Sequence, residues 1–368
     1  MQELQTEKLQ AIKLPQLPDN PLVSVLVANY NYAKYISETL ESVLCQTYLH
    51  FEVIVCDDGS TDNSCEVIET YVQKDPRIKL IRKQNGGVAT ALNTAYRQSK
   101  GEIVCILDAD DLWMPNKLER VVQKFRSDPQ CGFVIHNVIQ VDGDGNFIKS
   151  TPMFESLASG WMAPFALQNG GHVGNIPPAS ALSIRREVAN YIFPINQAFL
   201  RNADSLMISV GVLLTVIKSV PEVLTKFRLH GKNTSSQSTS TADFFEREQA
   251  SHARVHQEQK RLLTDVYGSE IAQKLTDLQS SIGICHDLYI ITRLKDACKV
   301  ERRKAHQQLI THPQFDTQFN WFNPKRWLFQ WDLPDVLFTI LFNQLYGVSS
   351  LKRLVRRLSW QFFKASTQ

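Results

Sequence analysis

Acidic side chains follow an apolar run near the middle of the chain in a pattern that suits a metal ion. Asp108 and Asp110 form a DxD pair directly after residues 103–107, which are Ile-Val-Cys-Ile-Leu. Their i, i+2 spacing on an extended segment or turn can aim both carboxylates at a common region. Hard oxygen ligands of this kind suit Mg²⁺ or Mn²⁺ better than zinc. The alternative is an acidic turn that only caps the following helix.

Two further polar segments could act together with this pair. Asp57-Asp58-Gly59-Ser60-Thr61-Asp62 follows another apolar run, and Asn85-Gly86-Gly87 lacks the Cβ atoms that would keep a backbone away from a diphosphate. Both are also typical of ordinary loops, because Asp-Gly is a turn signal and Ser60 or Thr61 can cap a helix. Neither segment is decisive alone.

A parallel sheet is the element that could bring these segments together. From Pro21 onward, short β-branched runs alternate with helical patterns, which predicts an α/β fold with helices on both faces of the sheet. Ligands of such sheets bind beyond the carboxyl ends of the strands. We therefore expect the polar segments that follow the first, second and fourth strands to meet in one crevice. The four predicted strands are 22–28, 51–56, 77–81 and 102–107.

The second half of this region predicts a less regular arrangement. Residues 131–141 are typical of a strand entering a tight turn at 142–146, which predicts a mixed sheet edge. Another strand is expected at 179–185. Residues 213–220 and 223–228 could form two strands, or a helix and a strand. The polar residues 231–241 are typical of a loop or linker, and 243–303 predict two or three helices.

Length and composition set the broad class of protein. The 368 residues predict an N-terminal extension (1–20), a catalytic domain (21–235) and a helical C-terminal region (236–368). A net charge of +3 is too small to indicate a nucleic-acid partner. The seven cysteines form no CxxC pair, and residues 1–13 contain no apolar signal segment, so we expect reduced thiols and a cytoplasmic location.

Taken together, the segments resemble family 2 of the inverting glycosyltransferases, which have the GT-A nucleotide-diphospho-sugar transferase fold. The match is collinear and covers about residues 21–235. The segments that carry it are Val23-Ser24-Val25-Leu26-Val27-Ala28-Asn29-Tyr30-Asn31, Ser42 with Gln46-Thr47, Val55-Cys56-Asp57-Asp58-Gly59-Ser60-Thr61-Asp62, Asn85-Gly86-Gly87-Val88 with Asn93, and Gly101-Glu102 leading to Leu107-Asp108-Ala109-Asp110-Asp111.

The resemblance implies one set of residues around the nucleotide. Asp58 would hydrogen-bond the base, Asp108 would contact the ribose or its neighbourhood, and Asp57 would support the site. The backbone near Ala28 and Tyr30 would flank the nucleotide. The full set of nucleotide-binding residues expected in this way is Ala28, Tyr30, Asp57, Asp58, Asn85, Gly87, Asp108 and Ala109.

The resemblance also implies residues for the metal, the diphosphate and the transfer step. Asp110 would hold the divalent ion, Mn²⁺ or Mg²⁺. A family landmark matches residues 227–235, where His230 would face the metal and Arg228 the diphosphate. Another landmark, often Glu-Asp, carries the catalytic base on its Asp and matches Ala203-Asp204. Asp204 also stands at the start of a predicted helix, so the alternative is a helix cap.

The expected function is metal-dependent transfer of a sugar, with inversion, from a nucleotide-diphosphate sugar to an acceptor hydroxyl. A UDP-sugar is the expected donor, and cell-surface polysaccharide or glycolipid synthesis the expected context. Two residues depart from the family pattern, Ala203 in place of Glu and Leu92 in place of Arg. The sequence has no Gln-x-x-Arg-Trp motif of processive synthases, which favours addition of a single sugar.

Three other functions are alternatives to this one. A sugar-1-phosphate nucleotidyltransferase is disfavoured because residues 28–31 form no Gly-rich loop, and a dehydrogenase because no G-x-G-x-x-G opens the first helix. A degenerate module of the same fold, which binds nucleotide or glycan without turnover, finds support in Ala203. Retention of the aspartates Asp58, Asp108, Asp110 and Asp204 argues against that alternative.

The acceptor side and the C-terminal tail leave more alternatives open. Trp161 and Phe165 could be platforms for sugar stacking or core aromatics, and residues 170–178 could form a rim loop. The acceptor could be a glycan, a glycolipid or a protein. The aromatic and basic tail, residues 320–368, predicts peripheral contact with the inner face of a membrane, and packing against the catalytic domain is the alternative.

Overall fold

The protein is described by a computed structural model that covers residues 9–174, 177–199, 203–231, 241–321, 323 and 325–346. The chain forms two compact units. Unit 1 consists of Met1–His230 with Val255–Thr276, and unit 2 of Gly231–Arg254 with Asp277–Gln368. The long helix α8 (Ala242–Tyr267) supplies residues to both units.

Unit 1 is built on an eight-stranded sheet with the order β3-β2-β1-β4-β7-β6-β8-β5. The half from β3 to β4 is parallel, and β7 runs antiparallel to both of its neighbours, β4 and β6. The sheet is therefore mixed and mainly parallel, which confirms the predicted fold class. The strands are β1 (Val23–Asn29), β2 (Phe51–Asp57), β3 (Ile78–Arg82), β4 (Ile103–Asp108), β5 (Leu112–Trp113), β6 (Cys131–Asp142), β7 (Leu182–Arg185) and β8 (Val216–Leu229).

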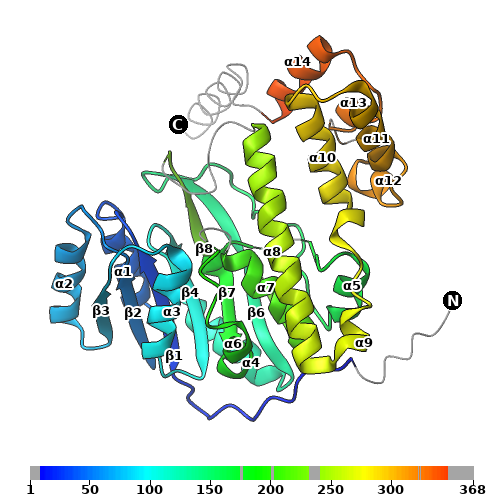
Figure 1. Ribbon diagram of the computed structural model, residues 1–368. Coiled ribbons are helices and arrows are strands. Elements are labelled where there is room, and N and C mark those ends of the chain that lie inside the picture. The colour runs from blue at the N-terminus through cyan, green and yellow to red at the C-terminus, as the bar shows by residue number, and fades with distance from the viewer. Residues whose placement is uncertain are drawn as a thin grey trace. The chain divides into compact units, whose positions relative to one another are not determined.

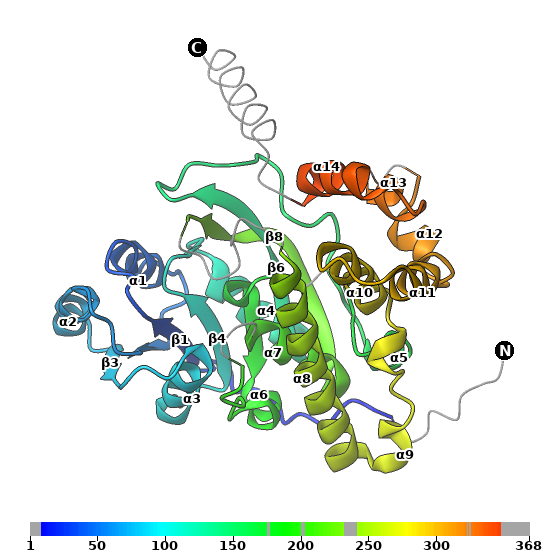
Figure 2. The ribbon, with the colours of Figure 1, turned by 45° about the horizontal axis from the view of Figure 1, so that its top comes forward.

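Helices cover both faces of this sheet, as Figures 1 and 2 show. Side chains of α1 (Ile36–Leu44), α2 (Ser64–Lys74) and α4 (Lys117–Ser127) pack in one apolar cluster with alternate residues of β1, β2 and β4. The other alternate residues of these strands pack with a second set of helices. That set consists of α3 (Val88–Gln98), α5 (Ala163–Gln168), α6 (Arg186–Ile192), α7 (Ala203–Leu214), the 255–267 part of α8, and α9 (Ser269–Ala272).

The strands of the parallel half begin and end within one residue of the predicted bounds. The β-branched residues of β1, β2 and β4 are buried, because each face of the sheet is covered. The helix predicted from Asp204 is present as α7. Burial of both faces, which the alternation of elements predicted, is thus confirmed.

The second half of unit 1 decides the open alternative for residues 213–228 and shortens the strand predicted at 179–185. Residues 213–228 form the end of α7 and a single strand, β8, which pairs in parallel with β6. The register of this pair shifts between His136 and Asn137, opposite Pro221, because proline cannot donate a hydrogen bond to the ladder. The predicted strand 179–185 is shorter than expected, since Ala179–Ala181 form a 3₁₀ turn (η1) ahead of β7.

Unit 2 is helical, as predicted for the C-terminal region. Tyr289, Phe329 and Phe338 are central residues of its separate apolar cluster. The predicted linker 231–241 lies largely outside the described residues. The helices of this unit are the 242–254 part of α8, α10 (Ile282–Leu294), α11 (Lys299–Ile310), α12 (Phe315–Gln318), α13 (Lys325–Phe329) and α14 (Asp335–Leu345), with a 3₁₀ turn, η2 (Leu278–Ser280).

Candidate active site

Three strand ends meet at one edge of the sheet. The pairing of β1 with β2 places Asn29 opposite Asp57, and the pairing of β1 with β4 places Ala28 opposite Asp108. Tyr30 follows at the end of β1 and its side chain is 45% exposed. The register therefore brings together the polar segments that the sequence singled out after these strands.

Asp57 is a supporting residue of this edge. Its buried carboxylate accepts hydrogen bonds from the Asn29 side chain at 2.7 Å and from the backbone N and Oγ of Ser60 at 2.9 and 2.6 Å. Burial alone would raise the pKa of Asp57, but the hydrogen bonds from Ser60 and Asn29 outweigh burial and lower it. The charged form of Asp57 thus fixes the turn after β2.

Asp58 joins that turn to the glycine loop after β3. Its carboxylate accepts hydrogen bonds from the backbone N of Gly86 at 3.0 Å and of Gly87 at 2.7 Å, and pairs with Lys83 Nζ at 2.5 Å. Gly87 has a φ of +86°, a conformation in which a side chain is strained. The Asn85 side chain is exposed.

Gly59 permits the close approach of these two loops. A Cβ at Gly59 would lie 2.9 Å from the backbone N of Asn85, and its φ is +78°. The two loops therefore pack backbone against backbone at this point. Lys83 was not predicted as a site residue, although the rule that polar residues follow strand ends applies to it, because β3 ends at Arg82.

The DxD turn is held from several directions. The carbonyl of buried Ala109 accepts a hydrogen bond from Thr39 Oγ1 at 3.0 Å. Asp110 Oδ2 lies 2.9 Å from His230 Nε2, and both side chains are less than a tenth exposed. Burial raises the pKa of Asp110, and the contact with His230 counteracts it in part. The structure thus places in contact the two residues that the resemblance assigned to the metal.

Asp111 anchors the turn to β8. Its Oδ1 accepts the backbone N–H of Arg228 at 2.8 Å, and its Oδ2 accepts the Ser180 hydroxyl at 2.6 Å. Ser180 Oγ in turn accepts the backbone N–H of Asp108 at 3.0 Å. Asp111 is fully buried, and burial together with the charges of Asp110 and Asp108 raises its pKa. Ser180 was not predicted as a site residue, and no sequence signal marked it.

The Arg228 guanidinium lies beside the DxD turn and is almost completely buried. Its Nε donates to the carbonyl oxygen of Asp110 at 2.8 Å, and its Nη atoms contact Glu38 Oε2 at 2.7 Å and the Gly143 carbonyl at 3.1 Å. The guanidinium also lies 4.9 Å from the centre of the Tyr35 ring. These contacts fix the turn from the β8 side.

The structure describes the remaining predicted residues only in part. Asp204 is the second residue of α7, but its side chain lies outside the described residues. Trp161 is half-buried against the core, whereas Phe165 on α5 is 49% exposed. The predicted rim loop 170–178 contains residues 175–176, which are not described.

A metal ion has two described donors at this site. Asp110 and His230 already lie in contact; the carboxylate suits Mn²⁺ or Mg²⁺, whereas an imidazole is more typical of softer divalent ions. Within the described ranges, no group of three or more His, Cys, Asp or Glu side chains could hold a metal. A bound diphosphate or water could supply further ligands, which is usual for Mg²⁺.

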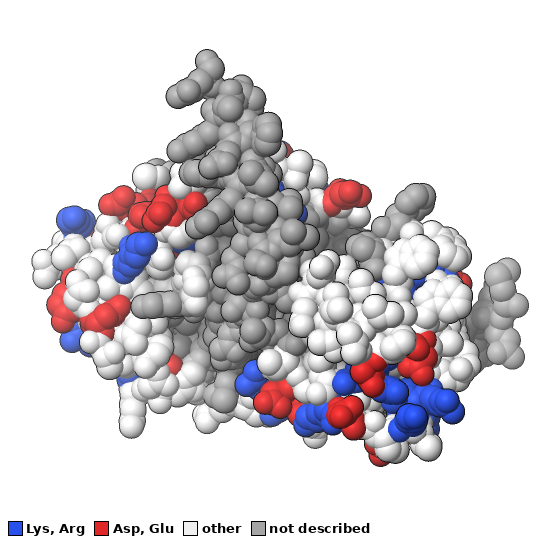
Figure 3. All heavy atoms as spheres, turned by 90° about the horizontal axis from the view of Figure 1, so that it is seen from above, with Lys and Arg blue, Asp and Glu red and all other residues white. Residues whose placement is uncertain are grey.

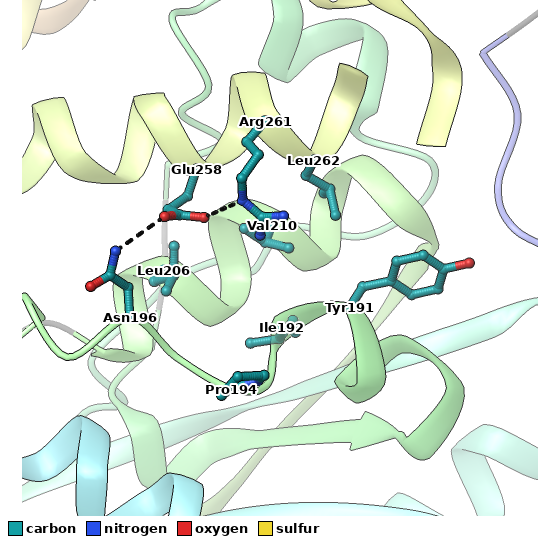
Figure 4. Close-up of a pocket in the computed structure, with 9 residues that line it drawn as sticks. All are labelled: Tyr191, Ile192, Pro194, Asn196, Leu206, Val210, Glu258, Arg261 and Leu262. Carbon is teal, nitrogen blue, oxygen red and sulfur yellow. Dashed lines mark hydrogen bonds and ion pairs between the residues drawn. The ribbon is translucent and has the colours of Figure 1, made fainter. Parts of the chain in front are cut away.

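A separate cavity of about 130 Å³ lies in unit 1 between α6, α7 and α8 (Figure 4). Glu258 on its wall pairs with Arg261 at 2.8 Å and contacts Asn196 at 3.5 Å. The described lining contains none of the predicted site residues, so we locate the chemistry at the strand ends instead. The residues that line the cavity are Tyr191, Ile192, Pro194, Asn196, Leu206, Val210, Glu258, Arg261 and Leu262.

Comparison with known proteins gives one family. A model described as Glycosyl transferase family 2 matches residues 24–193. An uncharacterized glycosyltransferase from Nostoc is 39% identical over 213 residues, which are 57% of this chain and 66% of the relative. Chondroitin synthase from Escherichia coli is 35% identical over 144 residues, 39% of this chain and 21% of that protein. The chain thus spans less than two thirds of the length of these relatives.

A further relative and two solved structures are also similar to this chain. A putative teichuronic acid biosynthesis glycosyltransferase from Bacillus subtilis is 40% identical over 31% of this chain and 45% of its own. TarS from Staphylococcus aureus, solved with UDP-GlcNAc, is 18% identical with a TM-score of 0.49 over 78% of this chain and 84% of its own. A mannosyltransferase from Pyrobaculum calidifontis is 19% identical with a TM-score of 0.47 over 84% of this chain and 86% of its own.

Proposed function

This chain belongs to glycosyl transferase family 2 through residues 24–193, and we propose that it transfers a sugar from a UDP-sugar to an acceptor hydroxyl with inversion. The observation that carries the proposal is the meeting of the Asp57-Asp58 turn, the DxD turn and the Arg228–His230 segment at one edge of the sheet. The membership agrees with the glycosyltransferase class and the GT-A fold that the resemblance implied.

The nucleotide would lie along the ends of β1, β2 and β4. The exposed ring of Tyr30 and the backbone of Ala28 would flank it, and Asp108 would face the ribose. Asp58 would accept a hydrogen bond from the base. Since Asp58 already accepts hydrogen bonds from Gly86 and Gly87, the base would meet a carboxylate that the loop holds in place.

The metal and the diphosphate would lie next to the DxD turn. Asp110 and His230 would hold Mn²⁺ or Mg²⁺, which supplies positive charge beside the leaving diphosphate. Arg228 would face the diphosphate beside them, and its contacts to the Asp110 carbonyl and Glu38 support a further role in fixing the turn.

The transfer step requires a base on the acceptor side. An acceptor hydroxyl is a poor nucleophile, so a carboxylate must take its proton as the oxygen bonds to the anomeric carbon and the bond to the diphosphate breaks. Asp108 and Asp110 are on the leaving-group side. We propose Asp204 for this role, because it is the acidic residue of α7 that matches the family landmark.

The names of two relatives support the context of polysaccharide synthesis. The Escherichia coli relative is named for chondroitin and the Bacillus subtilis relative for teichuronic acid. We therefore propose a glycan or glycolipid acceptor, with a protein as the alternative. A cytoplasmic location, with peripheral contact at the inner face of a membrane through residues 320–368, belongs to the same proposal.

Calorimetric titration tests the donor. UDP is expected to bind in the presence of Mn²⁺ or Mg²⁺, and hydrolysis of a panel of nucleotide sugars would then identify the donor. Failure of UDP, GDP and dTDP to bind with either ion would overturn the proposal. Binding without turnover of any donor and acceptor would instead favour a degenerate module, the alternative that Ala203 supports.

A further inference from the structure

Unit 2 exposes an unusual amount of aromatic surface. Trp321, Trp327 and Trp331 are 65%, 58% and 56% exposed. The other two described tryptophans, Trp113 and Trp161, are buried and half-buried. Exposed indole rings cost free energy in water, but they are stabilised where an apolar phase meets water, because the ring is apolar and its N–H is polar. The exposure therefore indicates a binding surface.

Helix α14 adds an apolar face to the same unit. Phe338 and Phe342 are buried in the core of unit 2, whereas Val336, Leu337 and Ile340 are 72%, 50% and 51% exposed. The i, i+1, i+4 spacing of the exposed residues places them on one side of the helix. Exposed Asn343 and Gln344 lie on the same side nearer the C-terminus, so the apolar part of this side is the N-terminal half of the helix. An exposed apolar helix face normally has something packed against it. The outward side of α14 thus requires an occupant.

The charges of this region favour an anionic occupant. Residues 315–346 contain three acidic residues, and each pairs with an arginine: Asp316 with Arg326 at 2.7 Å, Asp332 with Arg293 at 3.2 Å, and Asp335 with Arg302 at 2.6 Å. Their negative charges are therefore largely neutralised within unit 2. Residues 347–368, which follow α14, contain no acidic residue and five basic ones, Lys352, Arg353, Arg356, Arg357 and Lys364.

We infer that unit 2 docks on an anionic lipid surface, with the Val336–Leu337–Ile340 side of α14 and the three exposed tryptophans in the interface. We call these six residues the apolar docking surface. In the part of the chain that the structure describes, no helix is long and apolar enough to cross a bilayer. Apolar and aromatic side chains next to basic residues are the composition of helices that lie in the interface plane. Figure 3 shows uncharged side chains (white) beside groups of charged ones at the right of the view.

The lipid surface is favoured over a second copy of the chain for an electrostatic reason. A second copy carries the same basic 347–368 segment, and like charges repel. An anionic membrane instead attracts these segments, while it accepts the apolar docking surface. The inference deepens the proposed peripheral contact but does not rest on sugar transfer, since none of the residues named in it lies at the candidate active site.

Flotation of the full chain on vesicles tests the inference. Vesicles of phosphatidylcholine alone are compared with vesicles that also contain about 30% phosphatidylglycerol, at low and high salt. We expect binding to the anionic vesicles, weakened by salt because screening removes the basic contribution but not the apolar one. Equal or absent binding to both kinds of vesicle would overturn the inference.

Two variants separate the apolar and basic contributions. Val336→Ser with Leu337→Ser and Ile340→Ser should reduce partitioning onto anionic vesicles by about tenfold or more, because burial of these side chains in the interface is lost. The matched control is Leu49→Ser in unit 1, which changes a side chain that is 68% exposed and should leave flotation unchanged. Lys352→Gln with Arg353→Gln, Arg356→Gln and Arg357→Gln should remove the preference for anionic over neutral vesicles.

Folding and assembly measurements keep these outcomes interpretable. Circular dichroism and nucleotide binding of the triple serine variant should match the wild type, because the changed side chains are exposed. Unchanged flotation of this correctly folded variant would refute the role of α14. A dimer of the wild type that the triple variant loses, measured by light scattering, would assign the surface to a second copy and overturn the membrane inference.

Discussion

At the scale of single residues, the site is a set of carboxylates with different tasks. Asp57 and Asp111 are buried and accept hydrogen bonds from neighbouring protein groups. Asp110 contacts His230, and Asp108 stands at the end of β4. We expect the first two to matter for the shape of the site and the others for its ligands.

Removal of the Asp110 charge should weaken nucleotide binding through the metal. Asp110→Asn keeps the size of the side chain, but an amide oxygen is a weaker ligand for Mn²⁺ or Mg²⁺ than a carboxylate. Titration of UDP with Mn²⁺ should show a loss of affinity of about tenfold or more, and titration without metal a smaller change. Asp144→Asn is the matched control, because the Asp144 side chain is 80% exposed. Within the described residues, its one ion pair is with Lys34. Equal losses with and without metal would contradict the assigned role.

Replacement of Asp204 should separate binding from turnover. Asp204→Asn preserves the size of the side chain and much of its capping ability, but it removes the base. Donor affinity and unfolding should stay near wild type, while kcat falls by about a hundredfold or more. If Asp204 is only a helix cap, both kcat and stability should stay near wild type, because asparagine caps a helix about as well as aspartate. Unchanged turnover would place the base elsewhere, and retention of configuration in the product would rule out single displacement.

At the scale of elements, the sheet explains why the sequence could predict which polar segments meet at one edge. Residues that follow parallel strands reach the same edge whatever the details of the helices, so Asp57, Asp58 and Asp108 could be placed from the order of the strands alone. The same rule would have found Lys83. Ser180 and Glu38 could not be found, because η1 and α1 reach the site only through tertiary packing.

The second half of the sheet shows the limits of periodicity. Residues 213–228 are apolar enough for a helix or a strand, and only the pairing of β8 with β6 decides between them. The strand continues past Pro221 because a shift of register removes the need for its missing N–H. Such compensation depends on a partner strand, which the local sequence does not reveal.

A buried histidine on β6 should make unit 1 sensitive to acid. His136 is fully buried, and burial, assisted by the charge of Lys117, lowers its pKa from 6.5 to about 3. A folded-state pKa below the unfolded value means that the unfolded chain takes up a proton first as the pH falls. The stabilisation by neutral His136 is thus complete above about pH 6.5 and is lost progressively toward pH 3, at up to about 1.4 kcal/mol per pH unit.

Urea unfolding at pH 7 and pH 5 measures this effect. The free energy of unfolding of the wild type should fall by about 2 kcal/mol more than that of His136→Asn between the two values. The asparagine cannot titrate, yet it retains a polar group near the Asn137 carbonyl that His136 contacts at 3.0 Å. An identical pH dependence in both proteins would show that His136 does not supply it.

At the scale of the whole molecule, most of the cysteines fall into an exposed group and a buried group. All seven are unpaired, as the sequence predicted. Cys45 and Cys298 are exposed, whereas burial raises the pKa of Cys56 to about 11 and of Cys131 to about 12. Thiols react as thiolates, so the buried cysteines should be inert in the folded protein.

A thiol-reactive dye measures this division. The native protein should react rapidly at Cys45 and Cys298, slowly at half-buried Cys65, and completely only after unfolding. A reducing agent should leave the melting temperature unchanged. Fewer than seven reactive thiols in the unfolded, unreduced protein would reveal a disulfide and contradict the predicted reduced state.

The contacts that join the DxD turn to β8 and His230 also determine when the site can form during synthesis. Asp111 and Arg228 are 117 residues apart, and Asp110 and His230 are 120 apart. A ribosome releases the DxD turn long before β8, so the emerging chain holds three neighbouring carboxylates without the strand that neutralises and orients them. Contacts between such distant residues also form slowly. This edge of the sheet is therefore completed only after residue 230 has been made, and a chain that stops before residue 228 has the loops after β2 and β3 but lacks the contacts between the DxD turn and β8.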